Sequence, residues 1–167
     1  MEMASSPIAQ IGIQINPNVH LYQIAYSQET HAAVEEGFIP LDNRENRRPD
    51  WFEYWPIRNY LLTNQLKDDD FYGFFSTKFR LKTGLSAQQV VNFVRQFAAR
   101  TDVISFSPQP DMGSFFLNTF EQAEAFDSGM ISTYEAVLAQ AGLVIPLGRL
   151  VMDSRQIVFS NYFVADS

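Results

Sequence analysis

Residues 42–55, with the sequence DNRENRRPDWFEYW, concentrate side chains that could do chemistry. This segment holds both tryptophans of the chain and three of its 12 lysines and arginines. A guanidinium group fits a phosphate through two parallel hydrogen bonds, and an indole ring offers a flat apolar surface for stacking. The composition is therefore suited to a site in which the arginines clamp a phosphate or these side chains stack on a sugar.

The same segment also has a structural interpretation, which stays open at this point. Pro49 suits the first position of a helix, and the helix dipole favours the carboxylates of Asp50 and Glu53 near the helix N-terminus. The arginines would then pair with these carboxylates at the surface, and the tryptophans would lie in the core. Surface pairs of this kind are common and contribute little stability.

A run of three aspartates, Asp68 to Asp70, stands directly before an apolar, strand-like segment. Clustered carboxylates can hold Mg²⁺ or Mn²⁺. These aspartates, however, would lie at the amino end of the strand, whereas α/β sheets bind ligands at the carboxyl ends. A charged turn is therefore the favoured interpretation.

The overall composition excludes several classes of function. A net charge of −7 argues against nucleic acid as a general partner, since binding to a phosphate backbone needs a basic face. The chain has no cysteine, which excludes disulfides, thiolate zinc sites and cysteine nucleophiles, and its two histidines argue against a multi-histidine metal site. No apolar run is long enough to span a membrane and the N-terminus does not resemble a signal peptide, so we expect a cytoplasmic protein.

The order of predicted elements indicates an α/β fold. We expect residues 1–9 to be a loose lead-in and residues 10–167 to form a single α/β domain. Apolar runs without polar alternation are typical of strands that are covered on both faces, so we expect a mostly parallel sheet flanked by helices. The predicted strands are 10–15, 19–27, 70–76, 102–107 and an apolar segment near the C-terminus; the predicted helices are 27–37, 51–66, 86–100, 114–126 and 131–141.

The carboxyl ends of these strands are the places to look for a ligand. Tyr26 and Ser27 follow the strand at 19–27, and residues 76–78 (Ser-Thr-Lys) follow the strand at 70–76. The segment 107–111 (Ser-Pro-Gln-Pro-Asp) follows the strand at 102–107, so Asp111 is predicted to lie at the same edge. The P-loop, G-x-G-x-x-G, G-x-S-x-G and H-E-x-x-H motifs are absent from the sequence.

Taken in succession, four segments resemble bacterial glycosyltransferases of polysaccharide biosynthesis. The likeness extends over about residues 20–165. It implies a GT-A-like fold, which is a Rossmann-like three-layer arrangement, and a nucleotide sugar and a glycan acceptor as substrates. The four segments are GFIPLDNRENRRPDWFEYWPIRNYLL, DFYGFFSTKFRLKTGLS, DVISFSPQP and FSNYFVA.

This resemblance also implies roles for individual residues. The donor would bind at the carboxyl edge of the sheet, with Arg47 or Arg48 near its diphosphate and Trp51 and Trp55 as the wall of the sugar and acceptor site. Asp111 stands where these enzymes carry a D-x-D metal motif, so the resemblance implies Mn²⁺ or Mg²⁺ there. The remaining donor-binding residues would be Tyr26 and Ser27, near the base, and Asp42 and Asn43.

Two departures from the glycosyltransferase pattern leave a second function open. SPQPD replaces D-x-D, and the chain stops where further acceptor elements are expected, as in a truncated or minimal member. The alternative is a non-catalytic module that keeps the fold and binds a glycan, a nucleotide or a protein. An enzyme predicts that Asp42, Arg47 or Arg48 and Asp111 converge on one cleft, whereas a module predicts an exposed apolar patch around the tryptophans.

Overall fold

A computed structural model describes residues 16–107, 112–153, 158 and 160–167. The predicted lead-in, the predicted strand at 10–15 and the metal candidate Asp111 lie outside these residues. None of the helices within the described ranges is long and apolar enough to cross a lipid bilayer.

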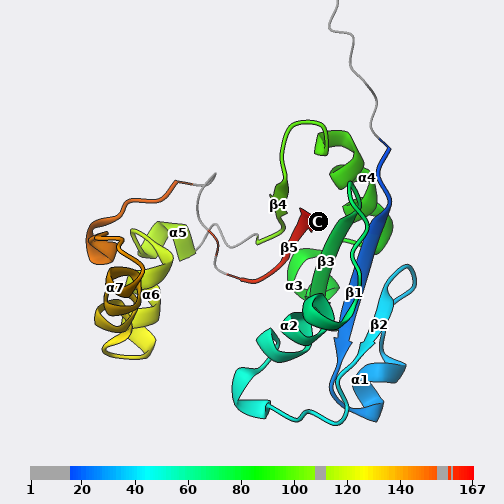
Figure 1. The fold of residues 1–167 in the computed structure, drawn as a ribbon, viewed down its shortest axis with the longest axis horizontal. Helices are drawn as coiled ribbons and strands as arrows, with labels where there is room; N and C mark the ends of the chain where they lie inside the picture. The colour runs from blue at the N-terminus through cyan, green and yellow to red at the C-terminus, as the bar shows by residue number, and fades with distance from the viewer. Residues whose placement is uncertain (1–15, 108–111, 154–157, 159) are drawn as a thin grey trace, which may run out of the picture.

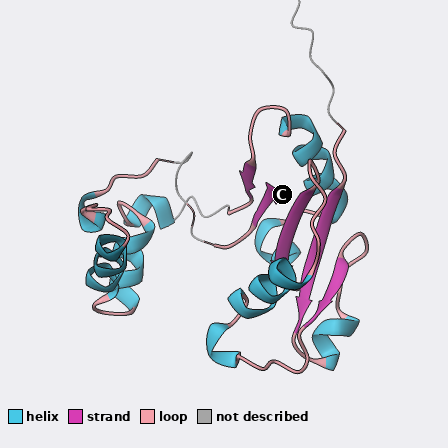
Figure 2. Ribbon diagram, viewed as in Figure 1, coloured by secondary structure: helices cyan, strands magenta, loops and turns pink. Residues whose placement is uncertain are grey.

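The centre of the fold is a five-stranded sheet with the strand order β2-β1-β3-β5-β4 (Figure 1). Strand β1 pairs in parallel with β2 on one side and with β3 on the other, whereas β5 pairs antiparallel with both β3 and β4. Figure 2 shows the strands side by side with helices around them. The strands are β1 (Val19–Ala25), β2 (Ile39–Asp42), β3 (Phe71–Ser76), β4 (Val103–Ser105) and β5 (Phe163–Asp166).

The sheet is therefore mixed, where the sequence predicts mostly parallel strands. The difference comes from β5, which enters between β3 and β4 and runs against both. Val164 of β5 is fully buried. A buried central strand is an apolar run whether it pairs parallel or antiparallel with its neighbours, so the sequence pattern does not indicate the direction of the strand.

Helices flank the sheet, and the clearest sequence signal among them is confirmed. Ser86 caps α4, with its side chain accepting from the backbone N–H of Gln89, and Val90 and Val94 of this helix are fully buried. The helices are α1 (Gln28–Ala32), α2 (Tyr54–Thr63), α3 (Phe79–Thr83), α4 (Ala87–Phe97), α5 (Met112–Phe115), α6 (Thr119–Phe126) and α7 (Met130–Gln140); the 3-10 turns are η1 (Pro49–Trp51) and η2 (Leu147–Arg149).

The predicted helix at 51–66 is interrupted near its start. The turn η1 ends at Trp51, the next residue, Phe52, has a φ of 47°, which is outside the helical region, and α2 begins at Tyr54. Pro56 therefore falls in the first turn of α2, where its missing N–H leaves no hydrogen bond unmade, so it does not kink the helix.

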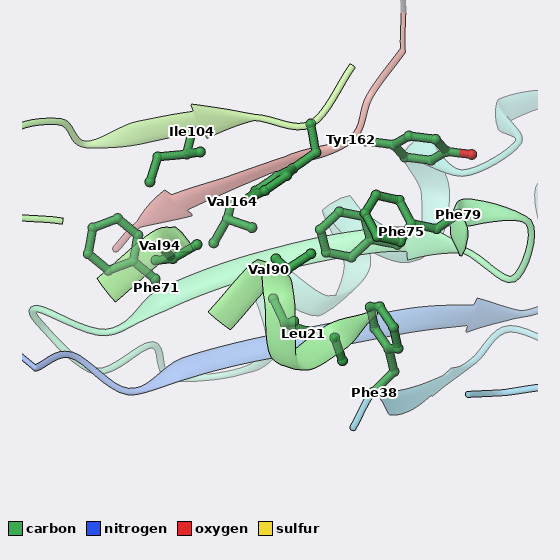
Figure 3. Close-up of a cluster of buried hydrophobic side chains, with 12 residues drawn as sticks. Leu21, Phe38, Phe71, Phe75, Phe79, Val90, Val94, Ile104, Tyr162 and Val164 are labelled. Atoms are coloured by element: carbon green, nitrogen blue, oxygen red, sulfur yellow. The ribbon is translucent and has the colours of Figure 1, made fainter. Parts of the chain in front are cut away.

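Each face of the sheet packs against its own helices. The larger core combines Leu21 of β1 and Phe75 of β3 with Phe79 of α3 and with the buried stripe of α4 (Figure 3). Successive strand residues point to opposite faces, so Tyr22 and Phe74 lie on the other side. There they pack with partly buried side chains that include Tyr60 of α2. The helix α2, which follows the Arg/Trp segment, is thus held against one face of the sheet.

Helices α5, α6 and α7 gather to one side of the sheet (Figure 1). Helices α6 and α7 pack against each other and against η2. Asn118 is fully buried here: its Oδ1 accepts from the N–H of Glu121 at the start of α6, and its Nδ2 donates to the carbonyl oxygens of Leu147 and Leu150. A single side chain thus joins the start of α6 to η2.

A buried carboxylate lies at the amino end of the sheet. Asp70 accepts from Asn18 at 2.8 Å, and its other oxygen is 2.8 Å from Nε2 of His20, whose ring stacks on Tyr72. The last aspartate of the acidic run is therefore a structural group that joins the starts of β1 and β3.

We expect Asp70→Asn to be less stable than the wild type near neutral pH, and the difference to disappear in acid. The hydrogen bonds from His20 and Asn18 lower the pKa of Asp70 below its ordinary value of 3.8. Its contribution to stability is therefore fully present above that value and is lost as the pH falls through the lower, folded-state pKa. Urea unfolding from about pH 7 to about pH 2 measures this, with Asp68→Asn as the exposed control, because the series must extend below the lowered pKa of Asp70. A difference between wild type and Asp70→Asn that persists in acid would contradict it.

Candidate functional site

Two hollows lie next to each other at the carboxyl ends of β1 and β2, and Asn43 lines both. We name them the large hollow, of about 730 Å³, and the small hollow, of about 470 Å³. Both volumes are typical of small-molecule sites. The large hollow is lined by Asp42, Asn43, Arg44, Glu45, Arg47, Trp55 and Asn59. The small hollow is lined by Ile24, Tyr26, Asn43, Asn46, Pro49, Phe52 and Glu53.

Strand pairing positions the loop that forms both hollows. The N–H of Asn43 donates to the carbonyl oxygen of Ala25 at 2.8 Å, which extends the pairing of β1 with β2 past the end of β2. The N–H of Asn46 then donates to the carbonyl oxygen of Asn43 at 2.9 Å and closes a turn. Asn46 has a φ of 41°, which asparagine tolerates better than most residues.

Phe52 is the conformational outlier of the site. Its φ of 47° is unusual for a bulky residue, a class of strain that costs about 1–3 kcal/mol, and its side chain is 80% exposed. Phe52 lines the small hollow together with Tyr26, which is 48% exposed. Two solvent-accessible rings in one hollow are suited to hold a planar ligand.

Each arginine of the loop pairs with a carboxylate two residues away, and of the pairs that the structural interpretation predicts, Arg48 with Asp50 is the one found among the described residues. Arg44 donates to both carboxylate oxygens of Asp42, through Nε at 2.9 Å and Nη2 at 2.6 Å. These bonds hold the pKa of Asp42 well below its ordinary range. Arg48 binds both oxygens of Asp50 and lies 4.1 Å from the centre of the Trp51 ring.

Arg47 is the loop arginine that is best placed for a ligand. Its Nε donates to Glu45 at 2.7 Å, and both side chains are 73% exposed. Within the described part of the chain, its two Nη groups make no hydrogen bond to protein, and the residue lines the large hollow. The two Nη groups of this guanidinium, which carry four N–H donors between them, are therefore available to an anion.

The large hollow has an aromatic side as well as a cationic one. Trp55 lines it, and Asn59, one helical turn further along α2, lines it too. Trp51 lies behind Trp55, with their ring centres 5.9 Å apart and edge to face. Trp51 itself is in neither lining of the two hollows, and Arg48 likewise lies outside both linings among the described residues.

A distant segment holds the carboxylate of the small hollow. The side-chain amide of Asn161 donates to Oε2 of Glu53 at 2.7 Å. The next residue, Tyr162, is buried, and its hydroxyl bonds to Oγ of Ser76 at the end of β3. Glu53 is thus anchored from the chain that leads into β5.

The structure brings together part of the predicted donor site. Asp42, Asn43 and Arg47 meet in the large hollow with Trp55, and Tyr26 lies in the small hollow that shares Asn43. Ser27 instead caps α1, where its hydroxyl accepts from the N–H of Thr30.

The predicted metal ion stays a prediction. Asp111 lies outside the described residues, and both oxygens of Asp42 are taken by Arg44. Within residues 16–107, 112–153, 158 and 160–167 there is no group of three or more histidine, aspartate and glutamate side chains that could hold a metal ion.

Sequence analysis did not assign eight of the lining residues to the site: Ile24, Arg44, Glu45, Asn46, Pro49, Phe52, Glu53 and Asn59. Asn59 could have been predicted from the sequence, because it lies four positions after Trp55 in a predicted helix and so shares its face. Phe52 gave no signal, since nothing in the sequence indicates a positive φ at a phenylalanine.

Comparison of the chain with models of known families, with curated proteins and with solved structures finds no match. A function must therefore be argued from the site itself rather than from relatives.

Proposed function

We propose that this chain is a glycosyltransferase of bacterial surface polysaccharide biosynthesis that binds a nucleotide sugar at the carboxyl edge of its sheet. The observation that supports the proposal is the pair of adjoining hollows that share Asn43. One hollow offers free guanidinium donors beside an indole, and the other offers two exposed aromatic rings. A nucleotide sugar has the matching parts, which are a planar base, a diphosphate and a sugar.

The two hollows suggest how the donor would be divided between them. The base would lie in the small hollow, between Tyr26 and Phe52. The diphosphate would pass Asn43 and meet the Nη groups of Arg47 in the large hollow, with the sugar against Trp55.

The chemistry that this arrangement would supply is stabilisation of the leaving group. When the bond from the sugar to the diphosphate breaks, negative charge develops on the phosphate oxygens. Preorganised donors at that place are commonly the largest single contribution to catalysis. Arg47 would provide them, and a bound phosphate would compete with Glu45 for its Nε, an exposed contact that holds the arginine only weakly.

A non-catalytic binding module is the second candidate, and one observation favours it. Apolar side chains are exposed around the tryptophans, notably Phe52, at 80%, Tyr54, at 62%, and Leu62, at 66%. An exposed patch of this kind is typical of surfaces that bind a glycan or a protein. Such a module would bind its ligand without turnover.

A panel of nucleoside diphosphates and nucleotide sugars, with and without Mn²⁺ or Mg²⁺, tests the donor site by thermal shift. A ligand at about 100 times its dissociation constant should stabilise the protein by about 2.7 kcal/mol, which raises the melting temperature by roughly 5–10 °C in a chain of this size. We expect Arg47→Ala to weaken binding by about 10- to 100-fold, since a hydrogen bond to a charged group contributes about 1.5–3 kcal/mol.

Arg100→Ala, which removes an exposed arginine after α4, is the matched control and should bind like the wild type. Binding without release of sugar to any acceptor would favour the module. A flat panel with the wild type would exclude the donor site in this chain.

A further inference from the structure

The small hollow combines two exposed aromatic rings with a carboxylate at its lining. Tyr26 and Phe52 supply the rings, and Glu53 supplies the carboxylate. Asn43 and Asn46 add side-chain amides. Rings bind any base by stacking, whereas a carboxylate accepts hydrogen bonds and donates none when it is ionised. The carboxylate therefore favours bases that present hydrogen-bond donors at their edge.

From this chemistry we propose that the small hollow selects guanine, so that the donor is a guanosine-diphosphate sugar. The inference rests on the proposed function, because it assigns the base of the same donor. Guanine presents two neighbouring donors, the ring N1–H and the exocyclic N2 amino group, with a spacing that matches the two oxygens of one carboxylate. Glu53 would accept from both, as carboxylates do from the paired donors of arginine.

The anchoring of Glu53 supports such a paired contact. Oε2 accepts from Asn161 at 2.7 Å, and each carboxylate oxygen has two lone pairs, so both oxygens keep acceptor capacity for a ligand. Asn161 precedes the buried Tyr162, whose carbonyl oxygen accepts from the N–H of Phe106 at 2.6 Å. The donor that orients the carboxylate thus comes from a fixed part of the fold.

The other common bases fit a carboxylate less well. Adenine and cytosine each place a ring-nitrogen acceptor beside their amino group, and uracil and thymine place their one N–H between two carbonyl oxygens. Each would bring a lone pair against the carboxylate, which is repulsive. Guanine also has a carbonyl oxygen next to N1, for which the side-chain amide of Asn46 is a donor at the same hollow.

Calorimetric titration with GDP and with inosine diphosphate (IDP) tests the assignment. These ligands differ only in the N2 amino group, so the ratio of their affinities isolates one hydrogen bond. We expect the wild type to bind GDP about tenfold more tightly than IDP, and more tightly than UDP, ADP or CDP. Glu53→Gln keeps the shape of the side chain and an oxygen for Asn161 but loses the charge, so the GDP-to-IDP ratio should fall toward one.

The matched control is Asp68→Asn, which neutralises an exposed carboxylate at the opposite end of the sheet and should keep the wild-type ratio. Circular dichroism establishes that both variants fold. Binding of UDP, ADP or CDP in preference to GDP would overturn the guanine assignment and leave the proposed function standing. A GDP-to-IDP affinity ratio that is the same in Glu53→Gln and in the wild type would also overturn the guanine assignment. No binding of any nucleotide would overturn the proposed function itself, and this inference with it.

Discussion

Replacement of Phe75 by alanine should lower the free energy of unfolding by about 3–5 kcal/mol, which is the usual range for a buried phenylalanine. The Phe75 side chain is fully buried in the larger core. Its ring centre lies 4.5 Å from that of Phe79 in α3 and 6.1 Å from that of Tyr162, beside β5. The substitution would therefore open a cavity between the sheet and two separate parts of the chain.

Chemical denaturation at equilibrium measures the loss for Phe75→Ala. Phe115→Ala is the matched control, because its ring is 80% exposed and its removal should change the stability by less than about 0.5 kcal/mol. Phe75→Leu, which fills most of the space, should cost clearly less than the alanine variant. Equal effects of Phe75→Ala and Phe115→Ala would show that Phe75 is not a core residue.

The second large effect is expected at Asn118, in the helices to the side of the sheet. Asn118→Ala removes an N-cap, worth about 1 kcal/mol, and leaves the carbonyl oxygens of Leu147 and Leu150 without their donor. An unpaired buried acceptor costs about 1–3 kcal/mol. Since α6, α7 and η2 bury few apolar side chains among themselves, these helices should open locally while the sheet stays folded.

Hydrogen exchange of the backbone amides, read by residue, measures this local opening. We expect Asn118→Ala to lose protection in α6 and α7 and to keep it in β1 and β3. Asn118→Asp separates the two roles, because aspartate still caps α6 but cannot donate to the two carbonyls. A variant with unchanged exchange in α6 and α7 would mean that Asn118 does not hold the helices together.

Local patterns in the sequence predicted most of the elements, since their causes are local. The capping box of Ser86 and the stripe of Val90 and Val94 follow from spacing along one helix. The orientation of β5 and the break at Phe52 could not be predicted in this way. The first depends on how a distant segment returns to the sheet, and the second on a backbone angle that the residue type does not favour.

The same difference between local and distant contacts decides which parts of the candidate site could be predicted. The sequence places Arg47 and Trp55 in one segment, and the structure brings both to the large hollow because α2 starts directly after the loop. The roles of Arg48 and Ser27 depend on their nearest neighbours, Asp50 and Thr30, which satisfy them locally. The contact of Asn161 with Glu53 spans 108 residues and has no signature in a single sequence.

The position of β5 has a consequence for synthesis on the ribosome. Its residue Val164 pairs with Gly73 of β3, 91 residues earlier. At a translation rate of about 5–20 residues per second, the edge of β3 would wait roughly 5–20 s for its partner. An apolar strand edge is a template for pairing with other chains, so the nascent protein is open to aggregation through this interval. The sheet is thus completed only when its last strand, β5, has been made, and a chaperone that covers the free edge of β3 would protect it until then.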